Sequence, residues 1–333
     1  MKKYLAAGAL ALATTAALSG QASAATICFA FQDLETEFWV AGHAAITSTL
    51  EEEGHTVIER NANEDANRQL EQVRDCIAQG VDGIIIIPQD GESAVTIVGE
   101  AQDNDVPIAV FNRPPSDLSR GIIVVADNET IAEQAVDYLV GNALEGADEG
   151  ETLQPLILVG DLGDPNAVGR KKGFYNAIGK QSDRFETPIE VATEWDAATA
   201  LSNLEAAVTA NPEIDLVFTS SDFLFPTIRS VFEPRGMWKT RDQEGHVVLG
   251  GLDGDATACQ LIKDGYVDAT GVQDLYYEAE AALDAILSAI DEGEYAPNVV
   301  LEDPGFALTA DSVTDSEMDM WGCVLLAEGF LEK

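Results

Sequence analysis

Polar side chains follow many of the short apolar runs in this 333-residue chain. Gln89 follows the run 83–87, and Asn112 and Arg113 follow the run 107–111. Comparable positions after other apolar runs are occupied by Asp161, Trp195, Ser221, Asp253 and Gln273. Amides, carboxylates and guanidinium groups bind hydroxyl groups, and an aromatic ring stacks on the apolar face of a sugar. This set indicates a site that binds a small hydroxylated ligand without altering it chemically.

Sequence signatures of an enzyme are absent. The chain has no nucleophile elbow of the form Gly-x-Ser-x-Gly, no P-loop and no dinucleotide-binding fingerprint. His43, His55 and His246 do not have the spacing of metal ligands. We therefore expect no catalysis, no metal and no cofactor. Turnover of a sugar or glycoside that depends on Asp253 would favour the alternative, an enzyme.

Elements that would position these side chains alternate regularly from Thr26 onward. Strand-like runs of β-branched residues are separated by segments of helical length and pattern. The first series of strands is 26–31, 56–59, 83–87, 107–111 and 121–125, and the second is 155–160, 188–193, 215–219, 246–251 and 268–271. Such alternation predicts an α/β fold with two similar doubly wound parallel-sheet lobes. Ligands of such sheets bind beyond the carboxyl ends of the strands, where the polar side chains stand.

The charge of the chain is strongly negative. Asp and Glu number 59 against 18 Lys and Arg, which gives a formal net charge of -41. Nucleic acids and anionic membranes need a basic face, so neither is expected as a partner. Because 46% of the residues are hydrophobic, a folded core is expected and not a disordered acidic chain. We interpret the excess as halophilic adaptation, in which salt screens self-repulsion, and an ordinary acidic periplasmic protein is the alternative.

The N-terminus has the pattern of a secretory signal peptide over residues 1–24. Met1, Lys2 and Lys3 precede an apolar run over 4–18, and small residues end in Ala22-Ser23-Ala24. The run is shorter than the roughly 20 residues of a membrane anchor. We expect cleavage after Ala24 and export to the periplasm.

Four cysteines in an exported chain permit disulfides. Cys28 lies in the first expected strand and Cys76 near the apolar stripe of an expected helix. If the sheet order brings that helix over the strand, these two can pair, which leaves Cys259 with Cys323. Free buried thiols are the alternative, because the sequence gives no distances.

At the positions described above, the chain resembles the type I periplasmic sugar-binding proteins of the ribose-binding kind. The resemblance covers 26 to about 309 and depends on the order of several motifs. It implies that Phe38 and Trp39 enclose the sugar ring, although by themselves both would be interpreted as core residues. It also implies that Asn112 and Arg113 in "VFNRPP" hold ring hydroxyls and that Arg170 in "NAVGRKKGF" donates two parallel bonds to neighbouring oxygens.

The resemblance extends to the second series of strands. Trp195 in "TEWDAA" matches the aromatic residue of the second lobe, and Ser221 in "VFTSSD" stands at an asparagine that contacts ligand. Asp253 in "GLDGD" and Gln273 in "ATGVQD" match the last two polar contacts, and Gln273 lies at a crossing between lobes. Helix N-caps are the better interpretation of three other carboxylates, namely Asp196, Asp222 and Asp255.

Three departures from the family pattern affect specificity. Thr36 and Ser221 each replace an asparagine, and the segment that ends in Gln89 does not match the middle contact of the first lobe clearly. Two amide donors to specific hydroxyls are therefore missing, so a sugar or polyol is indicated and ribose is not. The segment 310–333 extends past the usual family end, and its sequence indicates no function.

The resemblance also implies the organisation and the partners. The expected lobes are 25–126 plus 274–301 and 127–273 plus 302–333. Three hinge segments would cross between them, near Ala126 and Asp127, near Gln273, and over 302–307. A monomer that delivers a monosaccharide or polyol to the permease of an ABC transporter is expected. The alternative is a ligand-binding subunit of a membrane sensor or chemoreceptor. A repressor of the same core would need a basic DNA-binding segment ahead of Thr26.

Overall fold

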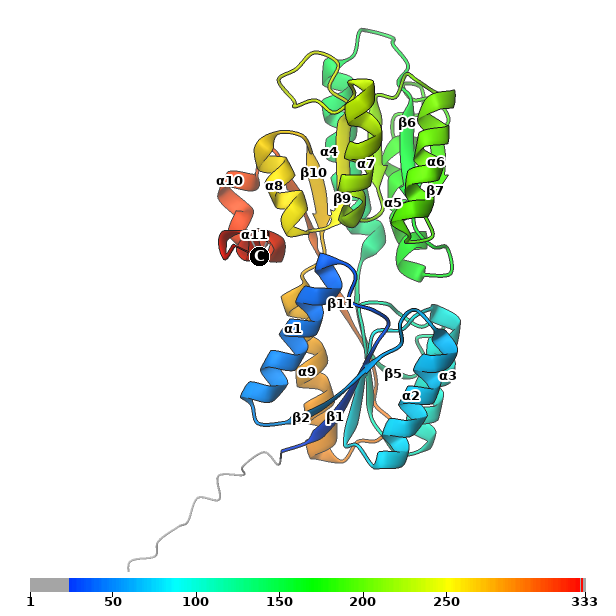
Figure 1. Ribbon diagram of the computed structural model, residues 1–333, viewed down its shortest axis with the longest axis vertical. Coiled ribbons are helices and arrows are strands. Elements are labelled where there is room, and N and C mark those ends of the chain that lie inside the picture. The colour runs from blue at the N-terminus through cyan, green and yellow to red at the C-terminus, as the bar shows by residue number, and fades with distance from the viewer. Residues whose placement is uncertain (1–23, 330, 332–333) are drawn as a thin grey trace, which may run out of the picture.

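The computed structural model describes residues 24–329 and 331. The expected signal peptide lies outside this range except for Ala24. Two α/β lobes lie one above the other along the long axis of the molecule (Figure 1). Among the described residues, no helix has the length and apolar character that a membrane crossing requires.

The first lobe is built on a six-stranded sheet in the order β11-β5-β4-β3-β1-β2, in which every pair is parallel. Its strands are β1 (Thr26–Phe31), β2 (Thr56–Asn61), β3 (Gly83–Ile86), β4 (Ile108–Phe111), β5 (Gly121–Ala126) and β11 (Asn298–Asp303). Its helices are α1 (Glu37–Glu52), α2 (Ala66–Gln79), α3 (Gly91–Asp103) and α9 (Leu275–Glu292). Helices α1 and α9 cover one face, and α2 and α3 the other (Figure 1). The central strands β3, β4 and β5 are buried at every position, as parallel strands covered on both faces must be.

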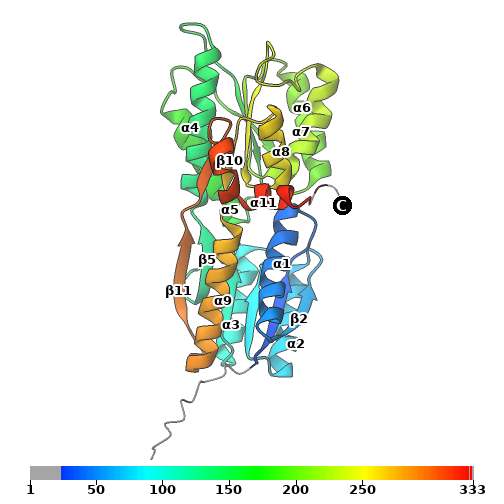
Figure 2. The same ribbon diagram turned by 90° about the vertical axis from the view of Figure 1, so that its left-hand side faces the viewer.

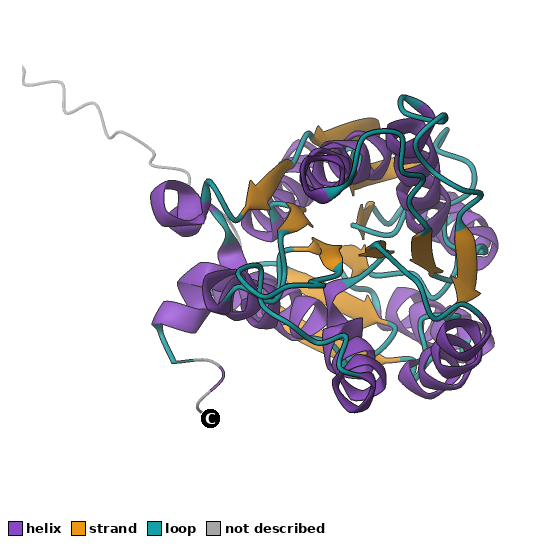
Figure 3. Ribbon diagram, turned by 90° about the horizontal axis from the view of Figure 1, so that it is seen from above, coloured by secondary structure: helices purple, strands orange, loops and turns teal. Residues whose placement is uncertain are grey.

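The second lobe repeats this plan in the order β12-β10-β9-β8-β6-β7, with only β12 antiparallel. Its strands are β6 (Pro155–Val159), β7 (Ile189–Ala192), β8 (Leu216–Thr219), β9 (Val248–Asp253), β10 (Ala269–Val272) and β12 (Phe306–Thr309). Its longer helices are α4 (Asn128–Gly146), α5 (Pro165–Gly179), α6 (Ala197–Ala210), α7 (Phe225–Phe232) and α8 (Ala256–Asp264). From above, helices surround the strands (Figure 3). The expected α/β class with two doubly wound lobes is confirmed.

All ten strands expected from sequence are present, and their ends differ by at most two residues. Strands β11 and β12 lie outside both predicted series. Glu302 and Asp303 pair with Val125 and Ala126, so the first sheet extends two residues beyond the expected lobe boundary at 301.

The chain passes between the sheets three times, between β5 and α4, between β10 and α9, and between β11 and β12. Asp303 connects all three crossings. Its backbone oxygen accepts from the Asp127 nitrogen at 2.9 Å, and its carboxylate accepts from the nitrogens of Asp274 at 2.6 Å and Gly305 at 2.9 Å. These bonds hold the three crossing segments side by side.

Both cysteine pairs considered from sequence are disulfides. Cys28 in β1 is bonded to Cys76 in α2, and Cys259 in α8 to Cys323 in α11 (Trp321–Ala327). The described residues contain no free cysteine. The second disulfide fastens the C-terminal segment, which also contains α10 (Val313–Ser316), against the second lobe.

Candidate ligand-binding site

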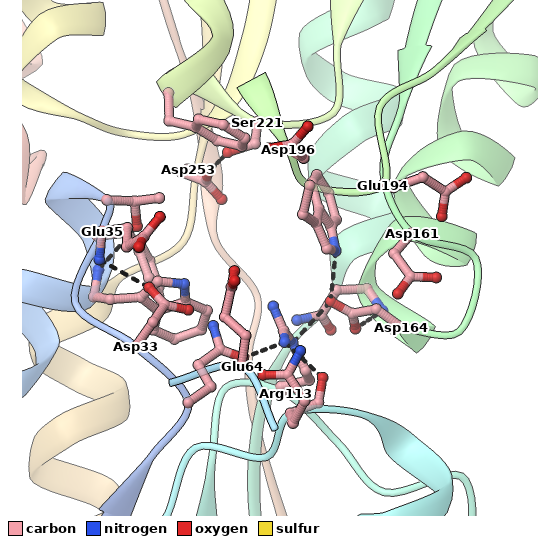
Figure 4. Close-up of a pocket in the computed structure, with 18 of the residues that line it drawn as sticks. Asp33, Glu35, Glu64, Arg113, Asp161, Asp164, Glu194, Asp196, Ser221 and Asp253 are labelled. Atoms are coloured by element: carbon pink, nitrogen blue, oxygen red, sulfur yellow. Dashed lines mark hydrogen bonds and ion pairs between the residues drawn. The ribbon is translucent and has the colours of Figure 1, made fainter. Parts of the chain in front are cut away.

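A cavity of about 580 Å³ lies between the lobes, at the carboxyl ends of strands from both sheets (Figure 4). Eight of the ten residues predicted from sequence line it: Phe38, Trp39, Gln89, Arg113, Arg170, Trp195, Ser221 and Asp253. Two do not, namely Asn112 and Gln273. Tertiary structure therefore brings together side chains that are more than 200 positions apart in the sequence.

Asp253 ends β9, and its carboxylate has three side-chain partners in the second-lobe wall. Arg170 Nη1 lies 2.9 Å from Asp253 Oδ1, and Gln273 Nε2 donates to the same oxygen at 2.9 Å. The Ser221 hydroxyl donates to Oδ2. Burial raises the pKa of Asp253, and the Arg170 guanidinium opposes this rise. Asp253 is thus part of a hydrogen-bonded network with Arg170, Gln273 and Ser221.

The backbone at Asp253 is strained. Its φ of 140° lies in a region that L-residues rarely adopt, at a cost of about 1–3 kcal/mol. The surrounding bonds hold this conformation and aim the carboxylate at the cavity.

Arg113 follows β4 and is the main cation of the first-lobe wall. Its Nη1 donates to the Gln89 backbone oxygen at 2.9 Å and to the Gln32 side-chain oxygen. Its Nε lies 2.9 Å from Oδ2 of Asp164, which belongs to the second lobe. Both side chains of this ion pair are more than nine-tenths buried, so it joins the lobes across the cavity away from solvent.

Asp164 is positioned by the start of α5. As the N-cap residue it accepts from the Asn166 nitrogen at 2.9 Å, while its other oxygen accepts from the indole nitrogen of Trp195 at 3.2 Å. One side chain therefore caps a helix, pairs with Arg113 and orients an aromatic ring of the cavity.

Aromatic rings come from both lobes. The Arg113 guanidinium lies 5.5 Å from the ring centre of Trp39, and that of Arg170 lies 5.6 Å from Trp195. Trp195 has a positive φ of 56°, and its ring lies so close to Gly160 that a Cβ there would come within 2.2 Å. Glycine at 160 is thus needed for the ring to reach the cavity.

Asn112 and Gln273 form a layer beneath the cavity. Asn112 Nδ2 donates to Gln273 Oε1 at 2.9 Å and to the buried carboxylate of Glu278 at 2.9 Å. Both amides are almost wholly buried. The geometry does not support the expectation that they contact ligand, because the buried Glu278 on α9 and Asp253 occupy their amide groups. Gln273 instead supports Asp253 from behind.

Carboxylates dominate the cavity lining, and of these only Asp161 and Asp253 were candidate site residues from the sequence. Besides Asp253, the lining contains Asp33, Glu35, Glu64, Asp161, Asp164, Glu194 and Asp196, against only two arginines. Burial and then the charges of Asp33, Glu35 and Asp196 raise the pKa of Glu64. The positions of Asp33 and Asp196 just after strands were an available signal, as the position of Asp161 was. Glu35 and Glu64 lie in loops without such a signal.

Two of the three expected helix caps are corrected. Asp196 caps α6 as predicted and accepts from the Thr199 nitrogen at 2.7 Å. Asp222 caps nothing; its Oδ2 accepts from the Gly254 nitrogen at 2.8 Å and from the Thr270 hydroxyl at 2.7 Å. Asp255 occupies the cap position of α8, but its side chain makes no capping bond. Asp222 accepts from the nitrogens that precede α8, and the Thr257 nitrogen in the first turn of α8 donates to the Glu37 carboxylate in place of a bond to Asp255.

The described part of the chain contains no group of three or more His, Cys, Asp or Glu side chains arranged to hold a metal ion.

Burial and the charge of nearby Asp253 raise the pKa of Asp222 to about 7. Asp222 lies behind the lining and contacts backbone groups, so its titration belongs to the stability of the lobe and not to a reaction in the cavity.

Comparison with known proteins identifies the family. Residues 27–294 match the model of the periplasmic binding protein domain. The ribose import binding protein of Bacillus subtilis is 25% identical over 255 residues, which cover 77% of this chain and 78% of the relative. The D-xylose-binding periplasmic protein of Escherichia coli is 25% identical over 252 residues, covering 74% and 72%.

Solved structures agree with this fold. A solute-binding protein of an ABC transporter from Actinobacillus succinogenes, with bound D-allose, superposes with a TM-score of 0.77 at 20% identity and covers 87% of this chain and 99% of that one. The resemblance seen in the sequence motifs is confirmed. This chain belongs to the periplasmic binding protein domain family, whose members bind solutes without catalysis.

Proposed function

We propose that this protein is the solute-binding component of an ABC-type sugar or polyol transporter. The observation that carries the proposal is the cavity between the lobes, where Asp253 and Arg170 face Arg113 and Trp39 across a space of about 580 Å³. A volume of this order suits a small ligand, and the lining offers hydrogen-bond donors, acceptors and two indole rings. Relatives named for ribose, D-xylose and xylitol support a pentose or a polyol.

Binding is proposed to proceed by hinge closure. The lobes 25–126 plus 274–303 and 127–273 plus 304–329 would rotate about the three crossings that Asp303 connects. Contacts between the lobes favour closure: Arg113 pairs with Asp164, and the Glu37 carboxylate accepts from the Thr257 nitrogen at 3.2 Å. A ligand that contacts both lobes would stabilise this closed state.

The charge of the lining restricts the class of ligand. Arg113 and Arg170 are each paired with a carboxylate, so neither is left to neutralise an anionic ligand. The remaining carboxylates repel anions and accept bonds from hydroxyl or ammonium groups. We therefore propose a neutral or amine-bearing sugar or polyol and disfavour a sugar acid.

A thermal-shift screen tests the proposal. The set should contain pentoses, hexoses, polyols, amino sugars and sugar acids, with hits measured by calorimetry. A specific ligand raises the melting temperature because it binds only the folded protein. A rise with at least one neutral or amino sugar and none with the acids is expected. Selective binding of a sugar acid would contradict the charge argument, and release of a chemically altered sugar would contradict binding without catalysis.

The partner in the membrane is proposed to be a permease. The protein would be exported to the periplasm, with its signal peptide cleaved after Ala24. There, as a monomer, it would present its closed lobes to the permease. A sensor or chemoreceptor would use the same cleft, so capture experiments with the liganded protein separate the two. Recovery of a sensor kinase or chemoreceptor in place of a permease would replace the transport proposal with the sensing one.

The acidic surface is proposed to be an adaptation to high salt. With a formal net charge of -41, self-repulsion destabilises the folded state in dilute buffer, and salt screens this repulsion. The melting temperature should therefore rise between dilute buffer and molar potassium chloride. Equal melting temperatures would contradict the proposal.

A further inference from the structure

The C-terminal segment lies beyond the part of the chain that matches the family model, which ends at residue 294. After β12 the chain forms α10 and α11, and α11 lies between α8 of the second lobe and the start of α1 in the first lobe (Figure 2). The segment therefore contacts the place where the two lobes meet.

Trp321 begins α11 and contacts both walls of the cavity from behind. Its indole Nε1 donates to the Asp253 backbone oxygen at 3.0 Å. Its ring packs edge to face against Phe38, with ring centres 5.7 Å apart. Asp253 belongs to the second lobe and Phe38 to the first, and both line the cavity. Only 2% of Trp321 is exposed, so the side chain is packed inside the protein and these contacts are part of that packing.

Backbone packing fixes the position of Trp321. Gly322 lies directly on the start of α8, where an added Cβ would come within 2.1 Å of the Gly254 oxygen. The Cys259–Cys323 disulfide fastens the next residue to the same helix. The indole is thus held against the strained backbone of Asp253 from two adjacent positions.

The outer face of α11 reaches toward the first lobe as well. Leu325 lines a surface groove together with Val40 of α1 and Tyr276 of α9. The segment packs against the first lobe through Trp321 and Leu325, whereas it is bonded to the second lobe by the disulfide and by the Trp321 indole. An opening motion would therefore separate Trp321 from Phe38 and leave it attached to Asp253.

We propose that Trp321 is a positioning residue of the binding site and that α11 acts as a clamp on the closed state. Its indole holds the Asp253 backbone in the conformation that aims the carboxylate at the cavity, and its ring meets Phe38 only when the lobes are closed. The inference depends on the proposed binding function for its consequence on affinity, but not for its consequence on lobe opening.

The first test measures how readily the lobes open in the absence of ligand. Hydrogen exchange in Trp321→Ala should become faster for the peptides containing Phe38 and Asp253, and small-angle scattering should show a larger radius of gyration for this variant. Trp321→Phe keeps a ring beside Phe38 and loses the indole donor, so its change should be confined to the Asp253 peptide. Unchanged exchange in both peptides would overturn the proposal.

The second test measures dissociation of a named probe, whichever of D-ribose, D-xylose and D-allose binds most tightly. Loss of the indole bond in Trp321→Phe should raise the dissociation rate about fivefold, and loss of bond and ring in Trp321→Ala about tenfold or more. If none of the three sugars binds, the exchange test alone decides the role of Trp321.

The two disulfides provide a matched control for general loss of stability. Cys259→Ser/Cys323→Ser releases the clamp, whereas Cys28→Ser/Cys76→Ser removes a crosslink of similar span away from the cavity. Only the first double variant should speed exchange at Phe38 and Asp253 and dissociation of the probe. Equal effects of the two double variants would mean that α11 serves stability alone and would overturn the clamp.

Discussion

The two walls of the cavity differ in how tightly their side chains are held. In the second lobe, Arg170 donates to the Asn128 side chain and the Ser220 backbone, both at 2.6 Å, and pairs with Asp253. In the first lobe, the side-chain oxygen of Gln89 is buried without a partner, and Glu64 lies among like charges. The Arg170–Asp253 pair of the second-lobe wall is held by internal bonds, although Ser220 Oγ behind it has no partner. Gln89 of the first-lobe wall, by contrast, has an unused acceptor.

This difference suggests a division of roles. A preorganised wall binds ligand with little loss of conformational freedom, and an unsaturated wall gains bonds only when ligand arrives. The second lobe would therefore set the position of a sugar, and the first would adapt to its hydroxyl pattern. Two of the three departures from the family, at Thr36 and near Gln89, fall in the first lobe, and the third, at Ser221, falls in the second.

The largest expected effect on ligand affinity comes from Asp253 in the second-lobe wall. Asp253→Ala should weaken binding by about 2 to 4 kcal/mol, because it leaves Arg170 and the Ser221 hydroxyl unpaired in the closed cavity. Calorimetry with the best sugar of the screen measures this loss. Asp253→Asn should retain part of the affinity, since it keeps an oxygen acceptor. Binding by Asp253→Ala as tight as by the parent would refute the site.

A pH effect of intermediate size should arise beneath the same wall. The pKa of Asp222 is about 7 when folded, against a usual 3.8, so the folded state binds more protons between these values. The unfolding free energy contributed by this group is therefore greatest below about pH 4 and is lost as pH rises to about 7.

Asp222→Asn removes this titration and keeps an oxygen that can accept from the Gly254 nitrogen. Urea unfolding from pH 5 to 8 should show a smaller loss of stability in this variant than in the parent. Parallel curves for the two proteins would show that Asp222 does not titrate in this range.

The smallest expected effects are on the unfolding free energy of the ligand-free protein, when one side chain from each wall is truncated. Ser221→Ala removes a bond to Asp253 and should lower the unfolding free energy by about 1 kcal/mol. Gln89→Ala should change it by less than about 0.5 kcal/mol, because the Gln89 side-chain oxygen has no partner and Arg113 binds only its backbone. Denaturant titrations of the two variants measure both values. Equal losses would remove the contrast between the walls.

Local signals in the sequence predicted much of the fold. Buried parallel strands were predicted from apolar runs such as 83–87 and 121–125, because strands covered on both faces are apolar on both faces. Asp196 was recognised as a helix cap because capping depends on residues close in sequence. The cavity residues that directly follow strands, such as Arg113 and Asp253, were likewise predictable, since the carboxyl ends of parallel strands meet at one edge.

Contacts between distant segments were decided only by tertiary structure. Asn112 and Gln273 follow strands as Arg113 does, yet their amides lie beneath the cavity. There the Asn112 amide donates to Glu278 on α9, and the Gln273 amide donates to Asp253. The pairing of Arg113 with Asp164, which restricts the charge of the ligand, depends on how the two lobes face each other.

The sequence by itself determined two α/β lobes, a polar site at their strand ends and the cysteines available for pairing. Tertiary structure decided which polar groups face the cavity and what the C-terminal segment contacts. The physical reason is that strand and helix formation depends on neighbouring residues, whereas burial, ion pairing and the contact of Trp321 with Asp253 depend on segments far apart along the chain.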